Sequence, residues 1–261
     1  MTVLSLQNGI IYGPVNSKRL GRSLGINLLP TTKKVCSFDC IYCHYGKTTA
    51  KTLFPEPNEL PTIEQIKIAI EQALKSPIKI DALTFSGNGE PMIHPDFSEI
   101  VKIATELKNR YRPQIPLTLL SNSSYLVKAI DIDTLSLINN RIFKLDCADQ
   151  DSFRIINNPV DDFSITAIID SLAKLAMALP IIIQTVFIDG TIKNYQGEIF
   201  DKWLEAIIKI RPQKIQIYST DRPVANQQVR MVEDEQLFEL AKIISKITEI
   251  PTTAYPAQKK R

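Results

Sequence analysis

The sequence has little net charge and no long apolar run. Its 31 lysines and arginines stand against 28 acidic residues in 261, which leaves a formal net charge of +3. Proteins that bind polyanions usually show a marked basic excess, so the charge alone does not indicate nucleic-acid binding. Residues 1–6 lack a basic segment and a long apolar segment, and the longest apolar stretch, Ile181–Ile188, is interrupted by Gln184 and Thr185. We therefore expect no signal peptide and no membrane span.

Cysteine is also scarce, and its distribution is uneven. Three of the four cysteines, Cys36, Cys40 and Cys43, lie within one short stretch. In a chain without a secretion signal, such clustering is typical of metal binding rather than of disulfides, which predicts a cytoplasmic protein. Thiolates are soft ligands that select zinc, copper(I) or iron–sulfur clusters. The clustered cysteines therefore predict a metal site.

The cysteine spacing alone allows three interpretations. A structural zinc site needs a fourth ligand, and His44 directly follows Cys43. Spacings of four and three also place cysteines on one face of a helix, where they would be small buried hydrophobes. An iron–sulfur cubane held by three cysteines keeps one iron open for a small molecule. We favour the iron–sulfur cluster, and Gly46 with the nearby polar residues argues against a helix core.

Strand and helix patterns alternate along most of the chain. Asn8-Gly9 predicts a short hairpin of Val3–Leu6 with Ile10–Tyr12, and six apolar strands follow, each before a helix. Such units require parallel strands with right-handed crossovers, and they curl into a full or partial barrel. The predicted strands are 25–29, 80–86, 117–121, 142–146, 181–188 and 214–218, and the longer helices are 62–75, 96–110, 165–178, 195–210 and 233–247.

The length suits one domain with a single large core. We divide residues 1–261 into an N-terminal cap (1–24), a core barrel (25–220) and a C-terminal helix with a polar tail (221–261) that ends in Lys259-Lys260-Arg261.

Two segments carry a resemblance to a known family. Cys-x3-Cys-x2-Cys with Tyr42 before the third cysteine resembles the signature of the radical S-adenosylmethionine (SAM) superfamily. The run from Gly13 to Leu29 resembles the branch of the archaeal tRNA wyosine-synthesis iron–sulfur oxidoreductases. This resemblance implies an α/β fold, a (β/α)6 partial TIM-type barrel with a short N-terminal hairpin cap, whose open side would admit a large substrate. It also implies a [4Fe–4S] cluster on Cys36, Cys40 and Cys43, with SAM on the open iron.

The carboxyl ends of the strands supply candidate SAM contacts, because ligands bind there in parallel α/β barrels. Gly87-Asn88-Gly89-Glu90 resembles the family's glycine–glycine–glutamate element for the amino group of SAM, with Asn88 in a glycine position, although a plain turn is the alternative. Glu90 could contact the ligand or brace the loop. Ser121 and Asn122 suit a ribose hydroxyl or a carboxylate, and a helix N-cap equally well.

Later strands add further candidates. Asp146 at the end of the fourth strand suits the ribose or the substrate, and Cys147 is a small core thiol or a reactive one. Gln184 interrupts an apolar strand and is either an inward amide near the cofactor or a satisfied buried glutamine. Tyr42 would pack beside the adenine. The expected cofactor contacts are Tyr42, Gly87, Asn88, Gly89, Glu90, Ser121, Asn122, Asp146 and Gln184.

Two polar loops supply substrate candidates. Lys18, Arg19 and Arg22 lie in a basic loop and could contact a phosphate, a carboxylate or an RNA backbone, the alternative being a solvated connector. Ser219 and Arg222 follow the sixth strand, and the resemblance makes them substrate-side candidates.

The resemblance implies that an electron from the reduced cluster cleaves SAM to methionine and a 5′-deoxyadenosyl radical, which abstracts a substrate hydrogen. The substrate is a small molecule, a peptide or a tRNA. A tRNA is not favoured, because the charge is nearly balanced and Cys147 alone cannot supply the second cluster of the wyosine enzymes. We expect a flavodoxin-like or ferredoxin-like electron donor and no membrane partner. The alternative class is a non-catalytic zinc or iron–sulfur module for binding or electron transfer.

Overall fold

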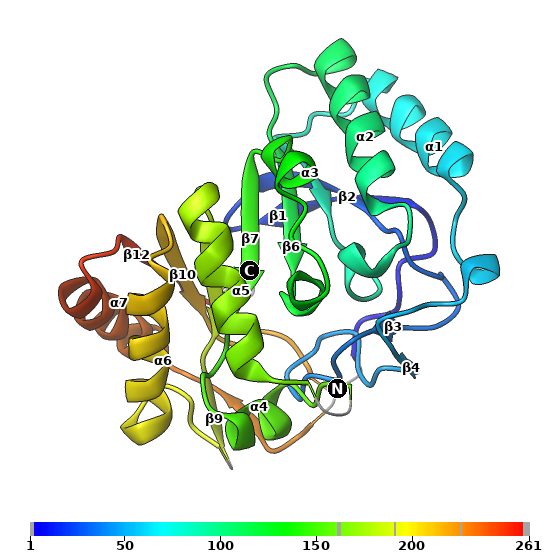
Figure 1. Ribbon diagram of the computed structural model, residues 1–261. Coiled ribbons are helices and arrows are strands. Elements are labelled where there is room, and N and C mark those ends of the chain that lie inside the picture. The colour runs from blue at the N-terminus through cyan, green and yellow to red at the C-terminus, as the bar shows by residue number, and fades with distance from the viewer. Residues whose placement is uncertain (1–2, 161–162, 191, 225, 258–261) are drawn as a thin grey trace.

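A curled half-barrel sheet forms the centre of the computed structural model (Figure 1). Among the described residues, 3–160, 163–190, 192–224 and 226–257, the sheet has eight strands in the order β1-β2-β5-β6-β7-β8-β10-β12. Every neighbouring pair is parallel except β1 with β2. The strands are β1 (Ile11–Ser17), β2 (Gly21–Ile26), β5 (Ala82–Phe85), β6 (Leu117–Ser121), β7 (Asn140–Lys144), β8 (Ile182–Val186), β10 (Lys214–Tyr218) and β12 (Thr252–Tyr255).

Helices cover the outer face of this sheet (Figure 1). They are α1 (Ile63–Lys75), α2 (Phe97–Tyr111), α3 (Ile132–Ser136), α4 (Gln150–Ile156), α5 (Ile165–Ala178), α6 (Gly197–Ile210) and α7 (Asp234–Thr248), with short 3-10 turns η1 (Pro57–Glu59), η2 (Pro91–Ile93) and η3 (Ser124–Val127). Their apolar sides are buried against the sheet; in α1, for example, these are Ile66, Ile70 and Leu74. No helix within the described residues combines the length and apolar character needed to cross a membrane.

Two small ribbons lie beside the main sheet. They are β3 (Val35–Cys36) with β4 (Ala50–Lys51), which run parallel, and β9 (Ile188–Gly190) with β11 (Val229–Met231), which run antiparallel.

Polar side chains line part of the inside of the half barrel. The hydroxyls of Ser23 and Thr84 are 2.7 Å apart on neighbouring strands, and Gln184 donates to Gln216 at 3.0 Å between β8 and β10. All four residues are buried. Because buried polar groups need hydrogen-bond partners, the two side chains of each pair bond to each other. Together the two pairs make the inner surface of the half barrel polar, which suits a ligand.

The six predicted strands are confirmed as a continuous parallel sheet, and the partial barrel is confirmed with them. The sequence pattern missed β12, which lies in the predicted polar tail beyond residue 220. Its four residues are only half buried at the sheet edge, so they lack the apolar signal of the other strands. The end of the predicted tail, Lys259-Lys260-Arg261, lies outside the described residues.

The predicted N-terminal hairpin is displaced along the chain. Asn8-Gly9 forms no hairpin turn; the hairpin is β1–β2, with its turn at residues 18–20, and the predicted first core strand begins earlier, at Gly21. The segment before β1 finds other partners instead, because Leu4 N donates to the His44 carbonyl at 2.8 Å and Gln7 N donates to Asn88 Oδ1 at 2.7 Å. Contacts with distant loops therefore outweigh the local turn preference of Asn8-Gly9.

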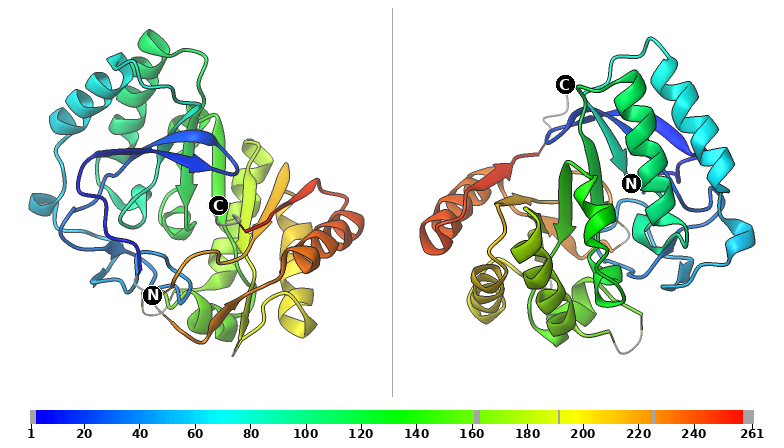
Figure 2. Two further views of the ribbon diagram at one scale, coloured as in Figure 1. Left: turned by 180° about the vertical axis from the view of Figure 1, so that it is seen from behind. Right: turned by 45° about the horizontal axis from the view of Figure 1, so that its top comes forward.

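The tip of the β1–β2 hairpin reaches the opposite edge of the sheet. Lys18 forms an ion pair of 2.8 Å with Asp221, in the loop after β10. The Arg19 guanidinium lies over the rings of Tyr218 and Tyr255, 4.3 and 5.8 Å from their centroids. Seen from behind, the blue hairpin extends across the sheet toward β12 (Figure 2, left). The side that we expected to be open for a large substrate is therefore bridged.

Candidate active site

The three clustered cysteines lie in the stretch that runs from the end of β3 to Gly46, which we call the cysteine loop. Cys36 is the last residue of β3, and in the irregular backbone that follows, Cys43 N donates to the Cys40 carbonyl at 3.0 Å. Residues 37–43 form no helix, so the interpretation of the cysteines as one helix face is wrong. All three are free thiols, with Cys36 buried and the other two partly exposed.

Helix α4, which sequence reasoning missed, anchors this loop. Asp39 N donates to the Asn157 carbonyl at 3.0 Å, directly after the helix. Phe38 packs edge-on against Phe153 of α4, with ring centroids 5.2 Å apart. A backbone bond and an aromatic contact therefore fix the position of the cysteine loop against the barrel.

Amide and ammonium donors surround the sulfur atoms. Asn122 Nδ2 lies 3.5 Å from Cys36 Sγ, and Asn157 Nδ2 lies 3.5 Å from Cys40 Sγ. Lys34 is 3% exposed and donates to the Gly46 carbonyl at 2.8 Å. Burial alone would lower the pKa of Lys34, but the charges of the three cysteines raise it. Each of these groups stabilises negative charge on sulfur.

This donor set fits an iron–sulfur cluster. Burial raises the pKa of Cys36 to about 12 and that of Cys40 to about 11, so these thiols ionise when a metal replaces the proton. Across the described residues, no three His, Cys, Asp or Glu side chains are grouped as ligands of a single ion. The cysteines of a cluster bind different irons and need not converge on one point.

A cavity of about 320 Å³ adjoins Cys36 and contains most of the predicted cofactor contacts. From the predicted set, its lining includes Gly87, Gly89, Glu90, Ser121, Asn122 and Gln184, all from the carboxyl ends of β5, β6 and β8 or close to them. We call this space the cofactor cavity. The structure thus brings six of the nine predicted cofactor contacts together beside one cysteine.

The glycine-containing loop after β5 packs directly on the cysteine loop. The Asn88 carbonyl accepts a hydrogen bond from Val35 N at 3.1 Å, and a Cβ on Gly89 would lie 1.6 Å from the Val35 carbonyl oxygen. The Asn88 side chain is not in the cofactor cavity. It is fully buried and bonds Gln7 and the Pro30 carbonyl, so this departure from glycine serves to attach the N-terminal segment.

Glu90 braces this loop against β6. Its Oε1 accepts from Met92 N at 3.0 Å and its Oε2 accepts from Asn122 N at 2.6 Å, so both oxygens have backbone partners. Burial nonetheless raises the pKa of Glu90 to about 7. Of the two roles left open by the sequence, bracing is the one that these contacts show.

The raised pKa of Glu90 predicts a pH-dependent stability of the metal-free protein. The unfolded chain deprotonates Glu90 near pH 4.5, whereas the folded chain holds the proton until about pH 7. Stability is therefore greatest below pH 4.5 for this group and falls by about 3 kcal/mol as pH rises to 7. We expect the urea midpoint of Glu90→Gln to fall less between pH 4.5 and pH 7 than that of the wild type. If the two midpoints fall equally over this range, the prediction is wrong.

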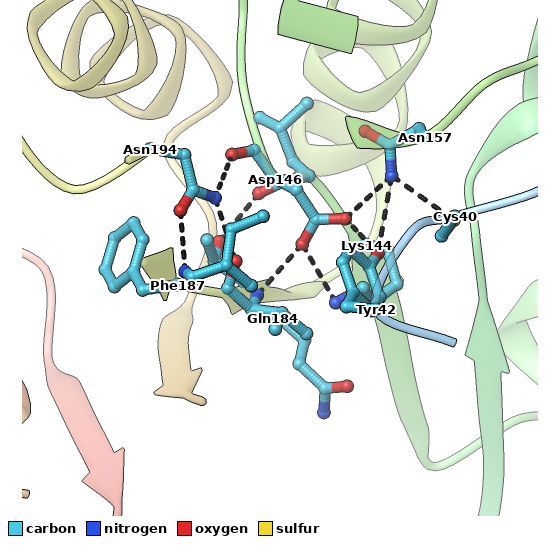
Figure 3. A network of polar contacts seen from close by, with 12 residues as sticks. Cys40, Tyr42, Lys144, Asp146, Asn157, Gln184, Phe187 and Asn194 are labelled. Carbon is cyan, nitrogen blue, oxygen red and sulfur yellow. Dashed lines mark hydrogen bonds and ion pairs between the residues drawn. The ribbon is translucent and has the colours of Figure 1, made fainter. Parts of the chain in front are cut away.

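A network centred on Asp146 joins the cysteine loop to the barrel (Figure 3). Asp146 Oδ2 accepts from the hydroxyl of Tyr42 and from Asn157 Nδ2, the latter at 2.9 Å. Asp146 Oδ1 accepts from Val186 N at 2.9 Å and pairs with Lys144 Nζ at 2.9 Å. Although burial opposes it, this carboxylate raises the pKa of Lys144, which therefore carries a buried positive charge.

These contacts change the expected roles of two residues. Asp146 is 2% exposed and lines neither cavity, because both carboxylate oxygens are used inside the protein. Tyr42 lies beside it and faces the second cavity described below. Gln184 points away from Asp146 (Figure 3), and it lines the cofactor cavity as a buried glutamine whose amide donates to Gln216. Cys147 is fully buried, which matches a small core thiol.

A second cavity, of about 390 Å³, lies between the hairpin and the cysteine loop. Its lining includes the predicted substrate contacts Lys18, Arg19 and Arg222, together with Cys43 and His44. It shares Tyr12, Tyr45, Ser86 and Leu120 with the cofactor cavity, so the two adjoin. We call it the substrate cavity.

Two predicted substrate contacts do not reach this cavity. Arg22 forms a two-bond ion pair with Asp81 at the amino end of the sheet, with distances of 2.6 and 2.9 Å. Ser219 is buried, where its hydroxyl donates to the Phe187 carbonyl at 2.7 Å and accepts from Val232 N at 2.9 Å. Arg22 lies near the start of β2, at the amino end of the sheet and away from the cavity. The hydroxyl of Ser219 is already hydrogen-bonded to two backbone groups.

A family model described as the radical SAM superfamily matches residues 32–225. The chain belongs to the radical SAM superfamily. The match begins before the cysteine loop and ends after Arg222, so it contains the clustered cysteines, most of the cofactor cavity and half of the residues that line the substrate cavity. The family implies an iron–sulfur cluster and SAM, which agrees with the donor set around Cys36 and Cys40.

Curated relatives of this radical SAM chain fall into two groups by length. A protein named GTPase Obg from Brachyspira hyodysenteriae is 27% identical over 242 residues, which are 90% of this chain and 33% of that protein. A UPF0026 protein of Methanocaldococcus jannaschii is 39% identical over 119 residues, 45% of this chain and 34% of that one. The chain thus spans about a third of these relatives. A Synechocystis UPF0026 protein is 28% identical over 278 residues, 95% of this chain and 97% of its own length.

Solved radical SAM structures share the fold. A structure of TYW1 with a lysine-pyruvate adduct superposes with a TM-score of 0.60 at 19% identity, over 86% of this chain and 73% of that one. A radical SAM methyltransferase from Sphaerobacter thermophilus gives a TM-score of 0.64 at 14% identity, over 91% and 67%. Streptococcus suis SuiB bound to SAM gives 0.64 at 14% identity, over 90% and 51%.

Sequence reasoning missed three residues of this radical SAM site. Lys34 stands two positions before Cys36, and its adjacency to the cysteines was the available signal. Lys144 was seen only as part of a strand end, although a charged residue in an apolar strand indicates a buried partner. Asn157 follows a helix that the pattern did not predict, and nothing local in the sequence links it to Cys40.

Proposed function

We propose that this protein is a radical SAM enzyme whose Cys36, Cys40 and Cys43 hold a [4Fe–4S] cluster and whose cofactor cavity binds SAM. When bound, the cluster supplies the electron that cleaves SAM to methionine and a 5′-deoxyadenosyl radical, which removes a hydrogen atom from the substrate. A flavodoxin-like or ferredoxin-like protein would supply that electron.

The juxtaposition of Cys36 with the Gly87–Glu90 loop carries this proposal. Both line the cofactor cavity, and the Asn88 carbonyl and Val35 N hold the two loops together at 3.1 Å. With three cysteines as protein ligands, one iron would stay open for a small molecule, and Cys36 borders a cavity that would admit one. A purely structural metal site would be closed by a fourth protein ligand.

The remaining site residues orient the ligands. Gly87 and Gly89 let this loop pack closely on Asn27 and Val35, where a Cβ would collide, and Glu90 holds the loop against the end of β6. Ser121, Asn122 and Gln184 would form the polar wall of the cavity beside SAM. Asp146, fully hydrogen-bonded, fixes Tyr42 and Lys144 at the boundary with the substrate cavity. These buried partners pre-organise the cavity and exclude water from a reactive radical.

The substrate would enter the second cavity, which adjoins the first. Its 390 Å³ suits a small molecule or one unit of a larger one, and the hairpin bridges the side on which a macromolecule would approach. Neighbours in the fold include TYW1, a methyltransferase and a peptide-bound SuiB, so the fold itself favours none of these substrate classes.

Anaerobic reconstitution followed by a deoxyadenosine assay tests the proposal. We expect a brown protein that forms 5′-deoxyadenosine from SAM when dithionite is added. A colourless protein with bound zinc, or a brown protein that leaves SAM intact under these conditions, would instead support the non-catalytic module.

The amide donors to sulfur predict a measurable effect on the cluster. Hydrogen bonds to ligand sulfurs favour the reduced state, so Asn157→Leu should lower the reduction potential by about 20–60 mV, the equivalent of one hydrogen bond. Asn122→Leu should shift it in the same direction at Cys36. Asn109→Leu on the exposed surface of α2 is the control. A potentiometric titration followed by EPR measures the shift, and equal potentials in all four proteins would refute it.

A further inference from the structure

The charged side chains of the substrate cavity are mostly positive. Among its described lining residues, Lys18, Arg19 and Arg222 stand against a single carboxylate, that of Asp221. Three cations against one anion leave an excess of two positive charges. A partly enclosed cavity with this excess concentrates anions, because its low-dielectric walls focus the field.

Asp221 pairs more closely with Lys18 than with Arg222. Lys18 Nζ lies 2.8 Å from its Oδ2, whereas Arg222 Nε lies 3.9 Å from its Oδ1, at the outer limit of an ion pair. Arg19 has no ion-pair partner in the part of the chain that the structure describes. Arg19 and Arg222 are therefore the cations with charge available for a ligand.

Arg19 is held in a geometry that leaves its donors usable. The central carbon of its guanidinium lies over the Tyr218 ring, 4.3 Å from the ring centroid, and Lys144 lies 5.2 Å from the same ring. A cation–π contact is made by the charge of the guanidinium, so its N–H groups can still donate hydrogen bonds to a ligand. The aromatic contact thus positions Arg19 without satisfying its hydrogen-bond donors.

His44 shows that these charges converge on one space. Its imidazole lines the same cavity as the side chains of Arg19, Asp221 and Arg222. His44 directly follows Cys43, so the cationic region borders the cysteine loop on the side away from the Gly87–Glu90 loop.

We propose that the substrate carries a carboxylate or a phosphate group, which Arg19 and Arg222 bind from two separate loops. This rests on the proposed function, because the cavity adjoins the one assigned to SAM. Arginine pairs suit both groups, since each arginine can donate two parallel hydrogen bonds to two oxygens. The anion fixes one end of the substrate, and the rest extends toward Tyr12 and Tyr45, where the two cavities meet.

Isothermal titration calorimetry on the cluster-loaded full chain tests this inference. Saturating SAM is present throughout, so that the anion cannot occupy the place of the cofactor's own carboxylate. The probes are sodium malonate, inorganic phosphate and the neutral malonate analogue malonamide. Arg19→Gln and Arg222→Gln are compared with Arg110→Gln, a matched change on the exposed surface of α2. Circular dichroism verifies that each variant is folded.

We expect one anion to bind at a single site and malonamide not to bind. Malonate binding assigns a carboxylate, and phosphate binding assigns a phosphate. Each cavity variant should weaken binding by about tenfold, the loss of one charged hydrogen-bonding partner, and Arg110→Gln should bind like the wild type. Absence of saturable binding by either anion up to about 10 mM, or equal binding by both cavity variants and the wild type, would overturn the inference.

The outcome is separable from that of the proposed function. A chain that cleaves SAM but binds neither probe loses only the anion site. A chain that binds malonate or phosphate through Arg19 and Arg222 but forms no 5′-deoxyadenosine retains the anion site and loses the proposed activity.

Discussion

Replacing Cys40 by alanine is expected to abolish the cluster and with it the cleavage of SAM. Cys40 is one of the three sulfur donors that we propose, and the fourth cysteine, Cys147, cannot replace it because it is fully buried beside Asn157. Loss of a ligand should reduce 5′-deoxyadenosine formation by more than about 100-fold, beyond the effect of removing a supporting residue. Iron content and the absorbance near 400 nm measure the cluster directly.

Cys147→Ala is the matched control for this experiment. It removes a core thiol that is not one of the three clustered cysteines, so the protein should remain brown and active. A colourless Cys147→Ala protein, or a Cys40→Ala protein with a full complement of iron, would show that the ligands are assigned wrongly.

Gly89→Ala is expected to be the most damaging change outside the cysteines. The added Cβ would lie 1.6 Å from the Val35 carbonyl, and Gly89 has a φ of 156°, which side chains rarely adopt. The added Cβ would collide with a backbone oxygen, so no movement of a side chain can relieve the clash. We expect a loss of more than about 3 kcal/mol in the free energy of unfolding, and failure to assemble the cluster.

The substitution Gly197→Ala measures the cost of a positive φ alone, so comparing it with Gly89→Ala isolates the cost of the clash. Gly197 also has a positive φ, of 64°, but nothing lies within 4 Å of the position of its Cβ. Its substitution should cost about 1 kcal/mol and leave cluster assembly intact. Denaturant unfolding of both variants makes the comparison; equal costs would mean that contact with the cysteine loop is unimportant.

The repetitive parts of the fold could be predicted from the sequence because they are set by local apolar patterns. Helix α5 spans the predicted residues, and each of the six predicted parallel strands lies in the sheet. Elements without that pattern were missed, notably the half-buried edge strand β12 and the short helix α4. The hairpin was displaced because Gln7 and Leu4 bond distant loops, which no local rule of turn formation contains.

The candidate site also contains some residues that could be predicted from the sequence and some that could not. That Ser121 and Asn122 lie beside a cavity could be predicted, because they end or follow β6 and the topology brings the carboxyl ends of parallel strands together. The separate positions of Arg19 and Arg22 could not, since neighbouring basic residues look alike until Arg22 meets Asp81 at the far end of the sheet. Asn157 was missed because its contact with Cys40 joins residues 117 positions apart.

The most direct test of this account is the EPR spectrum of the reduced, reconstituted protein with and without SAM. If three cysteines hold the cluster and the open iron faces the cofactor cavity, adding SAM will change the spectrum of the reduced cluster. An unchanged spectrum, together with a fourth protein ligand on the metal, would contradict the account.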